Sequence, residues 1–325
     1  MIRRTTVIVL PLALVCALAV VFLRTGDDDS PPLVRLPLPA LDPAHAENFS
    51  GQNAYQHVAR IVAFGPRPPA SEGYEKTLQY LESTLAECGW KTRRQSFTAA
   101  TPDGPTRFTN LIARHQRAPA PRDPLPIVLG GHLDSKKLPF PFVGANDGGS
   151  STGVMLEIAR VLAKHPQDAA AIELVFFDGE EAFREGISSA DGLYGSKYYA
   201  HQLIAQPEQP AFSIVIDLIG DAKVPLFYNT DAPSYTIAAL KKIQSDRPFK
   251  NGLHPAPGPY LDDHVPLQNI GLPCLHLIGN FKAMPYWHQP GDTLDKIDPD
   301  MLEKVGQLVL QTLAIQRAPK PTADE

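Results

Sequence analysis

Two adjacent glutamates, Glu180 and Glu181, follow an apolar stretch in the segment LVFFDGEEAF at residues 174–183. The four apolar residues predict a buried strand, and the Asp-Gly that follows predicts its end. Neighbouring side chains on an extended backbone point in opposite directions, so the two carboxylates are not expected to bind one metal ion equally. One can bind the metal ion while the other transfers protons as general base and then general acid. A solvated acidic turn would need neither the apolar strand before the pair nor Phe183 after it.

Other polar residues also lie at the ends of predicted strands. His132 and Asp134 follow the segment IVLGG, Asp217 ends FSIVID, and His276 lies within CLHLI. Ligands of open α/β sheets collect beyond the carboxyl ends of the strands, where the loops converge. The strands are therefore expected to deliver these carboxylates and imidazoles to one edge of a sheet.

A set of imidazole and carboxylate side chains suggests a metal site. Taken singly, each residue has an ordinary structural explanation. Asp147 can be a helix N-cap, His132 a hydrogen-bonded core histidine and His288 a loop histidine. Together with two further carboxylates they form a nitrogen and oxygen ligand set without thiolates, which suits zinc with one coordination position left open for catalysis. The set is His132, Asp147, Glu181, Asp217 and His288.

Strands and helices alternate along most of the chain. Apolar periodicity predicts helices within residues 72–90, 151–165, 194–204, 233–244 and 299–317, and strands within 91–99, 109–115, 126–132, 170–178, 212–220 and 271–278. This alternation predicts a mostly parallel sheet covered by helices on both faces. The expected fold is a single α/β domain, built as a three-layer sandwich around a mixed, mostly parallel sheet.

The 325 residues divide by composition into four parts. Residues 1–26 have a basic start and an apolar run, which predicts a signal anchor, with a cleaved signal peptide as the alternative. Residues 27–50 are proline-rich and are expected to be a linker, 51–318 the catalytic domain and 319–325 a tail. The basic residues precede the apolar run, so the domain is expected outside the cytoplasm, in the periplasm or cell envelope if anchored and secreted if cleaved.

Charge and cysteine content limit the partners. The net charge is −5 and the domain has no basic stripe, which excludes nucleic acid as an expected partner. Membrane contact is expected only through the N-terminal segment, and the domain is expected to be a monomer. Cys88 and Cys274 are the two cysteines beyond that segment; they are expected to be separately buried thiols, although a disulfide between them remains an alternative.

The order of the polar motifs resembles that of the zinc aminopeptidase family, whose metal ligands run His-Asp-Glu-Glu-Asp-His. The motifs are HLDS, GANDGGSSTGVMLEIAR, FFDGEEAF, LYGS, DDHVPL, GLPCLHLI, WH and DTLDKI. Within that family the chain is most similar to the animal-type glutaminyl cyclases, over about residues 53–313. The resemblance implies an aminopeptidase-like fold and action on peptides or proteins with an N-terminal glutamine.

Several features favour the cyclases over the aminopeptidases. The insertion AFREGISSADG separates Glu181 from LYGS, and Asp262 stands where the aminopeptidases commonly carry a serine. Asp217 in IDLIGD, His276 in CLHLI and Trp287 before the next histidine also match the cyclase pattern. A two-zinc aminopeptidase is the alternative function, and a non-catalytic receptor-like domain on the same scaffold is a third hypothesis.

The cyclase resemblance also implies roles for individual residues. One zinc ion would be held by Asp147, Glu181 and His288, and Glu180 would move the proton from the attacking α-amine to the leaving amide nitrogen. Asp217 and Asp262 would form a carboxylate network with Glu180. Trp287 would pack against the substrate, and His276 would line its pocket.

Two features depart from a simple transfer of these roles. Gly186 stands in the insertion where the animal enzymes carry a tryptophan at the entrance of the site. His132 and Asp217 occupy positions that hold a second zinc ion in the aminopeptidases. His132 and Asp134 are therefore candidates either for binding a second metal ion or for supporting the ligands of the first, so that one zinc ion is expected and two are not excluded.

Overall fold

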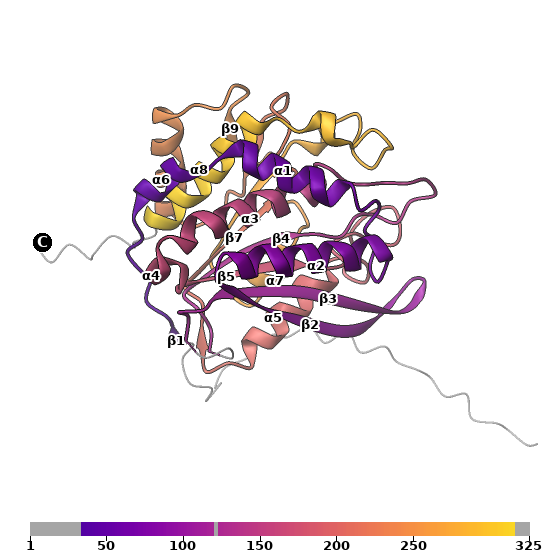
Figure 1. Cartoon of the computed structure of the whole chain (residues 1–325), viewed down its shortest axis with the longest axis horizontal. Coiled ribbons are helices and arrows are strands. Elements are labelled where there is room, and N and C mark those ends of the chain that lie inside the picture. Colours follow the sequence, from indigo (N-terminus) through magenta and orange to yellow (C-terminus); the bar gives the residue numbers. More distant parts are fainter. Residues whose placement is uncertain (1–33, 120–122, 316–325) are drawn as a thin grey trace, which may run out of the picture. The chain divides into compact units, whose positions relative to one another are not determined.

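The computed structural model describes residues 34–119 and 123–315, drawn in colour in Figure 1. The expected N-terminal anchor at 1–26 and the expected tail at 319–325 lie outside the described residues. Among the described helices, none is both long enough and apolar enough to span a bilayer. Cys88 and Cys274 are both free thiols, the first half-buried and the second buried.

The centre of the fold is an eight-stranded sheet in the order β2-β3-β5-β4-β7-β10-β8-β9. β5, β4, β7 and β10 run parallel to one another, whereas β2, β3 and β5 are joined antiparallel and β8 pairs antiparallel with β10. The mixed, mostly parallel sheet is thus confirmed. Its strands are β2 Trp90–Thr101, β3 Gly104–His115, β4 Ile127–His132, β5 Ile172–Phe177, β7 Phe212–Asp217, β8 Leu226–Tyr228, β9 Leu253–Pro255 and β10 Cys274–Gly279.

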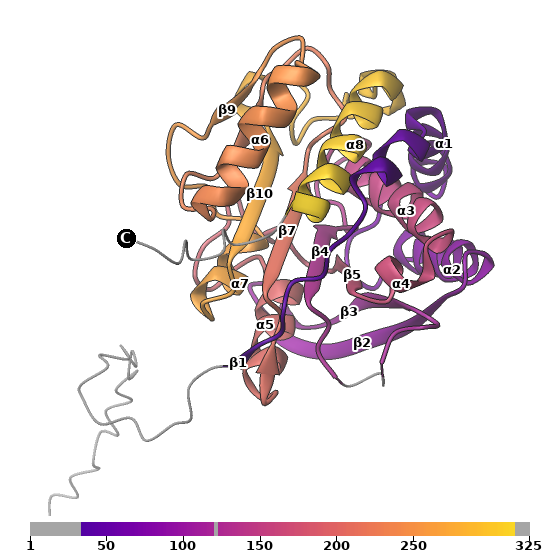
Figure 2. The same cartoon turned by 90° about the vertical axis from the view of Figure 1, so that its left-hand side faces the viewer.

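Helices cover both faces of this sheet, which makes three layers (Figure 2). α1, α2, α3, α6 and α8 pack on one face, and α5 and α7 contact each other on the opposite face. The helices are α1 Gly51–Val62, α2 Glu72–Glu87, α3 Gly149–Ala163, α4 Pro166–Ala169, α5 Tyr194–Ile204, α6 Ser234–Asp246, α7 His264–Asn269 and α8 Pro299–Ile315. α1, α7, β8 and β9 are additions to the elements that the sequence predicts.

Burial explains why the central strands read as continuous apolar runs. Every residue of β4, β5, β7 and β10 is buried, because helices cover both sides of the parallel strands. α3 is buried along nearly its whole length because it lies between the sheet and the outer helices α1 and α8. Most polar side chains of this region therefore gather where these strands end.

Residues 34–50, which the sequence predicts to be linker, are packed into the domain. The short strand β1 (Val34–Arg35) pairs with β6 (Glu208–Gln209), and the 3-10 helix η1 (Pro43–Asn48) contacts α8. Phe49 is buried against α8, where a side chain at Gly306 would collide with its ring. Proline-rich composition thus misleads here, since the apolar residues between the prolines bury enough surface to hold the segment in place.

Candidate active site

The candidate site lies beyond the carboxyl ends of β4, β5 and β7. His132, the last residue of β4, is paired with Phe177, the last residue of β5, so both strands end at the same level. Asp217 is the last residue of β7. The parallel direction of these strands brings to one edge of the sheet side chains that are up to 85 residues apart in the sequence.

Three residues form a candidate metal centre. The Nε2 atom of His288 lies 3.3 Å from Asp147 Oδ2 and 3.3 Å from Glu181 Oε1. Both carboxylate oxygens are buried and accept no hydrogen bond within the described chain. One nitrogen and two oxygen atoms that converge on a single point, without other partners, fit a zinc ion with one position open.

The charges around His288 also fit a bound cation. Burial alone would lower the pKa of His288, but the carboxylates of Glu181 and Asp147 raise it to about 10. The centre therefore strongly favours positive charge at this point. The backbone of His288 has a φ of 52°, a conformation that residues other than glycine seldom adopt and that recurs at functional sites.

Asp134 holds the backbone of the glutamate pair. Its two carboxylate oxygens accept hydrogen bonds from the backbone N–H groups of Glu180 (3.2 Å) and Glu181 (3.3 Å). Asp134 is fully buried, and its Oδ1 atom also lies 3.5 Å from His132 Nδ1. The structure thus places Asp134 beneath the pair as a support and outside the converging metal ligands.

Asp292 likewise holds the backbone of Asp147 through hydrogen bonds. It accepts hydrogen bonds from the backbone N–H groups of Asn146 (2.8 Å) and Asp147 (3.1 Å). Burial and the nearby Asp147 carboxylate raise the pKa of Asp292 to about 7. Sequence reasoning did not assign a role to Asp292, although it lies in the DTLDKI motif, because only the fold brings residues 146 positions apart into contact.

His132 joins the metal centre to the neighbouring carboxylate. Its Nε2 atom lies 3.0 Å from Asp217 Oδ1 and 3.3 Å from Asp147 Oδ1, so the three side chains form a second group able to hold a metal ion. Asp147 belongs to both groups. Burial alone would lower the pKa of His132, but the carboxylates of Asp217, Asp134 and Asp147 together raise it well above its ordinary value.

Glu180, Asp217 and Asp262 line one cavity of about 280 Å³ next to the metal centre. Burial raises the pKa of Glu180 well above its ordinary value; His132 opposes this, and the Asp262 carboxylate adds to it. Burial also raises the pKa of Asp217 to about 6 against the opposing effect of His132. Glu180 and Asp217, whose pKa values are both raised, are therefore expected to share protons rather than to ionise independently.

His276 lies behind Asp262 and is not among the residues that line this cavity, contrary to the role that the resemblance implies. It is only 1% exposed, and its Nε2 atom lies 2.6 Å from Asp262 Oδ2. Burial alone would raise the pKa of Asp262, but the charge and hydrogen bond of His276 lower it below its ordinary value. His276 therefore positions Asp262 and keeps it ionised instead of facing the substrate.

Aromatic and apolar side chains form the outer wall of the cavity. Trp287 lines it as expected, and its ring stacks on the imidazole of His288 at 4.2 Å and packs on Phe281 at 4.6 Å. Gly186 and Ile187 of the insertion lie at the same cavity, and a side chain at Gly186 would meet no atom within 4 Å. The entrance thus has room where the animal enzymes carry a tryptophan.

Asp191 links the two ends of the insertion after the glutamate pair through hydrogen bonds. This carboxylate accepts hydrogen bonds from the backbone N–H groups of Phe183 (3.0 Å) and Arg184 (2.9 Å), and from the hydroxyl of Tyr194 (2.9 Å). Arg184 also binds Asp103 at the turn between β2 and β3. These contacts hold the insertion at the entrance of the cavity.

The chain is similar to known proteins in both sequence and structure. The model of peptidase family M28 matches residues 110–313. A glutaminyl-peptide cyclotransferase-like protein of Mus musculus is 32% identical over 280 residues, which cover 76% of this chain and 71% of the relative. A solved glutaminyl cyclase of Porphyromonas gingivalis is 29% identical with a TM-score of 0.74, over 83% of this chain and 100% of that one. A Zn-dependent exopeptidase of Parabacteroides distasonis is 26% identical with a TM-score of 0.71, over 83% of this chain and 99% of that one.

Proposed function

Because the chain belongs to peptidase family M28, we propose that its site acts as a zinc-dependent glutaminyl-peptide cyclotransferase. Such an enzyme converts the N-terminal glutamine of a peptide or protein to pyroglutamate and releases ammonia. The observation that carries this proposal is the carboxylate of Asp262, which lies 2.6 Å from His276 Nε2 and lines the same cavity as Glu180. An aminopeptidase commonly has a serine at this position.

Glu180 is the proton-transfer group of the proposed reaction. The α-amine of the bound glutamine attacks the carbon of its own side-chain amide, the ring C–N bond forms, and the original amide C–N bond breaks. Glu180 takes the proton from the attacking amine and delivers it to the departing nitrogen, which leaves as ammonia. Its raised pKa suits a group that must both accept and return a proton near neutral pH.

The remaining residues hold and orient the reactants. Asp217 and Asp262 surround Glu180 with negative charge, which favours binding of the positively charged amine of the substrate before its deprotonation. Trp287 and Phe281 give the cavity an apolar wall that packs on the substrate and limits access of water. Attack within one molecule needs no activated water, since proximity supplies much of the rate.

Asp147, Glu181 and His288 would hold one zinc ion. When bound, this ion supplies Lewis-acid polarisation of the amide carbonyl. We propose a single ion because His132 lies within hydrogen-bonding distance of both Asp217 and Asp147 and can join them as an imidazolium.

The direct test is to incubate the zinc-loaded protein with a peptide that begins with glutamine and to analyse the product by mass. The expected product has lost one ammonia and has no free α-amine. Release of free glutamine and a shortened peptide would instead indicate the aminopeptidase reaction. The same peptide beginning with asparagine is the matched control and should remain unchanged, because its side chain is too short for five-ring closure.

A two-zinc aminopeptidase remains the second candidate because His132, Asp147 and Asp217 form a second group able to bind a metal ion. Metal analysis of the purified protein separates the two proposals. Two tightly bound zinc ions together with hydrolysis of aminoacyl anilides would favour the aminopeptidase.

We also propose that residues 1–26 tether the domain on the outer side of the cytoplasmic membrane. The support is the basic start followed by the apolar run. Fractionation of cells should recover the full-length chain in the membrane fraction, resistant to extraction with alkaline carbonate. A soluble chain that lacks its first residues would identify a cleaved signal peptide instead.

A further inference from the structure

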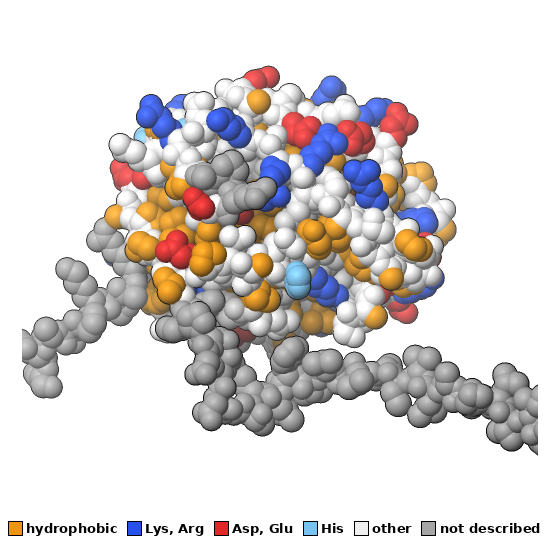
Figure 3. Space-filling model, turned by 90° about the horizontal axis from the view of Figure 1, so that it is seen from below, with side chains coloured by type: hydrophobic (Ala, Val, Ile, Leu, Met, Phe, Trp, Pro, Cys, Tyr) orange, Lys and Arg blue, Asp and Glu red, His pale blue; other side chains and the backbone are white. Residues whose placement is uncertain are grey.

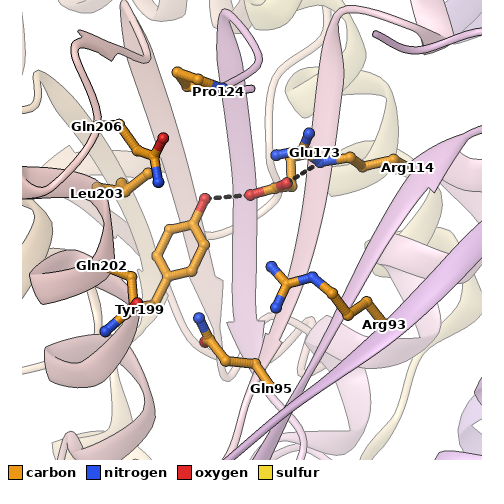
Figure 4. A pocket seen from close by; sticks show the side chains of 9 residues that line it. All are labelled: Arg93, Gln95, Arg114, Pro124, Glu173, Tyr199, Gln202, Leu203 and Gln206. Carbon is orange, nitrogen blue, oxygen red and sulfur yellow. Dashed lines mark hydrogen bonds and ion pairs between the residues drawn. The ribbon is translucent and has the colours of Figure 1, made fainter. Parts of the chain in front are cut away.

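A second cavity, of about 350 Å³, lies at the end of β5 that is remote from the glutamate pair (Figure 4). We propose that this cavity binds a small monocarboxylate through Arg93 and Gln95. The cavity is lined by Arg93, Gln95, Arg114, Pro124, Glu173, Tyr199, Gln202, Leu203 and Gln206, none of which lines the candidate active site. β2, β3, β5 and α5 contribute most of these side chains.

The charges in this cavity leave one surplus positive charge. Glu173 is only 3% exposed, and both of its carboxylate oxygens are engaged, one by Arg114 and the other by the Tyr199 hydroxyl. Arg93 forms no ion pair or hydrogen bond with any residue that the structure describes, and its guanidinium points into the cavity in Figure 4. The pairing of Arg114 with Glu173 therefore leaves the charge of Arg93 available to a ligand.

The hydrogen bonds around Gln95 fix a donor toward the same space. The backbone N–H of Asp178 donates to Asn110 Oδ1 at 2.9 Å, which makes Asn110 Nδ2 the donor to Gln95 Oε1 at 2.9 Å. Gln95 must then direct its NH₂ group away from Asn110, and Figure 4 shows it facing the cavity near Arg93. Gln95 is only 8% exposed, so this donor is held in place and has no protein partner among the described residues.

A monocarboxylate fits these groups better than a more highly charged anion. The planar guanidinium of Arg93 matches a carboxylate, and the NH₂ group of Gln95 adds a neutral donor beside it. A dianion would bring an uncompensated negative charge close to the buried Glu173. The Tyr199 hydroxyl donates to Glu173, so its oxygen can accept a hydrogen bond from a hydroxyl group of the ligand.

The positive charge of the cavity is local. On the face seen in Figure 3, Lys and Arg side chains alternate with Asp and Glu side chains and do not form one basic surface. The chain carries a net charge of −5. This mixed surface charge therefore suits a small ligand recognised by one arginine better than a polyanion such as nucleic acid.

The test is titration of the zinc-loaded protein with sodium L-lactate, followed by saturation-transfer NMR. Wild-type protein is expected to show saturable binding, and Arg93→Gln should raise the Kd at least about tenfold, because it removes the cation of this cavity that has no partner among the described residues. Gln95→Glu should weaken binding to a similar degree, since it keeps the acceptor for Asn110 but replaces the NH₂ donor with a negative charge. Circular dichroism and thermal melting verify that both variants are folded.

Arg94→Gln is the matched control. Arg94 is the next residue along β2, but it binds Glu75 and Glu82 on α2, on the other side of the strand, so lactate binding should stay within about twofold of wild type. Lactate binding that persists unchanged in Arg93→Gln would place the ligand elsewhere, for example on the zinc ion, and would overturn the proposal. An absence of saturable binding to wild type, or binding of phosphate tighter than that of lactate, would overturn it as well.

Discussion

At the scale of single residues, Glu180 and Glu181 are neighbours in the chain but have different surroundings. Both glutamates line the same cavity, and Glu181 Oε1 also lies 3.3 Å from His288 Nε2 within the candidate metal centre. The backbone of both residues rests on Asp134. We therefore expect the two glutamates to have different tasks in the proposed reaction.

Glu180→Gln is expected to lower kcat for a glutamine-initiated peptide at least about 100-fold while zinc stays bound, because the amide can no longer transfer the proton. Glu181→Gln, the matched variant, should instead lose zinc, since a neutral amide is a much poorer ligand. Zinc content by atomic spectroscopy and kcat measured on the same preparations check both statements. Equal loss of zinc from the two variants would contradict the assigned tasks.

Asp134→Asn is expected to weaken zinc binding about 10- to 100-fold, because it sets an NH₂ group against one of the two backbone N–H groups that the carboxylate now accepts. Competition with a chelator of known affinity measures the change. Asp191→Asn is the control, since Asp191 also accepts two backbone N–H groups but lies outside the metal centre. The support proposed for Asp134 fails if both variants alter zinc affinity alike.

At the scale of elements, α7 shows how a short helix takes part in the site. Its first residue, His264, stacks on His276 with ring centroids 4.0 Å apart, and His276 in turn holds Asp262. Burial and the neighbouring His276 lower the pKa of His264 to about 3, so His264 is neutral beside the ionised Asp262 over the physiological range. The stack gives Asp262 and its partner a rigid apolar support.

The lowered pKa of His264 predicts a dependence of stability on pH. Unfolded histidine titrates near pH 6.5, so between about pH 3 and 6.5 the unfolded state binds one more proton and folding weakens as the pH falls. His264→Gln should therefore show a shallower loss of the free energy of unfolding on acidification from pH 6.5 to 4, by up to about 1.4 kcal/mol per pH unit. Urea unfolding at several pH values measures the slope, with exposed His254→Gln as the control. Parallel slopes for His264→Gln and wild type would contradict the expectation.

At the scale of the whole domain, residues 34–50 connect the N-terminal part of the described chain to helix α8 near its C-terminal end. Leu41, Ala46 and Phe49 are buried, and η1 contacts α8, the last of the described helices. His45 Nε2 also lies 2.6 Å from Asp168 Oδ2, beside α4. This segment therefore ties the two ends of the domain together instead of serving as a free spacer.

Phe49→Ala is expected to lower the free energy of unfolding by about 3–5 kcal/mol, because it empties the space between η1 and α8. Denaturant unfolding of the full chain measures the loss. The neighbouring exposed residue provides the control: Glu47→Ala should change the free energy of unfolding by no more than about 0.5 kcal/mol. A loss of less than about 1 kcal/mol for Phe49→Ala would indicate that the segment is loosely attached.

The amino-acid sequence alone determined the order of the main strands and helices, because apolar periodicity reports directly on burial. It also indicated the polar residues that follow the strands, since parallel strands must end at a common edge. The resemblance to the zinc aminopeptidase family implied Asp147, Glu181 and His288 as metal ligands, and the fold brings these three side chains together.

Only the tertiary structure decided which residues support the site and which segments pack against the domain. Asp292 beneath Asp147, Asp134 beneath the glutamate pair and His276 behind Asp262 depend on how the loops fold over the strand ends. The burial of residues 34–50 and the cavity at Arg93 likewise depend on surfaces assembled from distant segments. A sequence records the type of each side chain, whereas a hydrogen bond needs both partners at a defined distance and angle, which the packed chain alone provides.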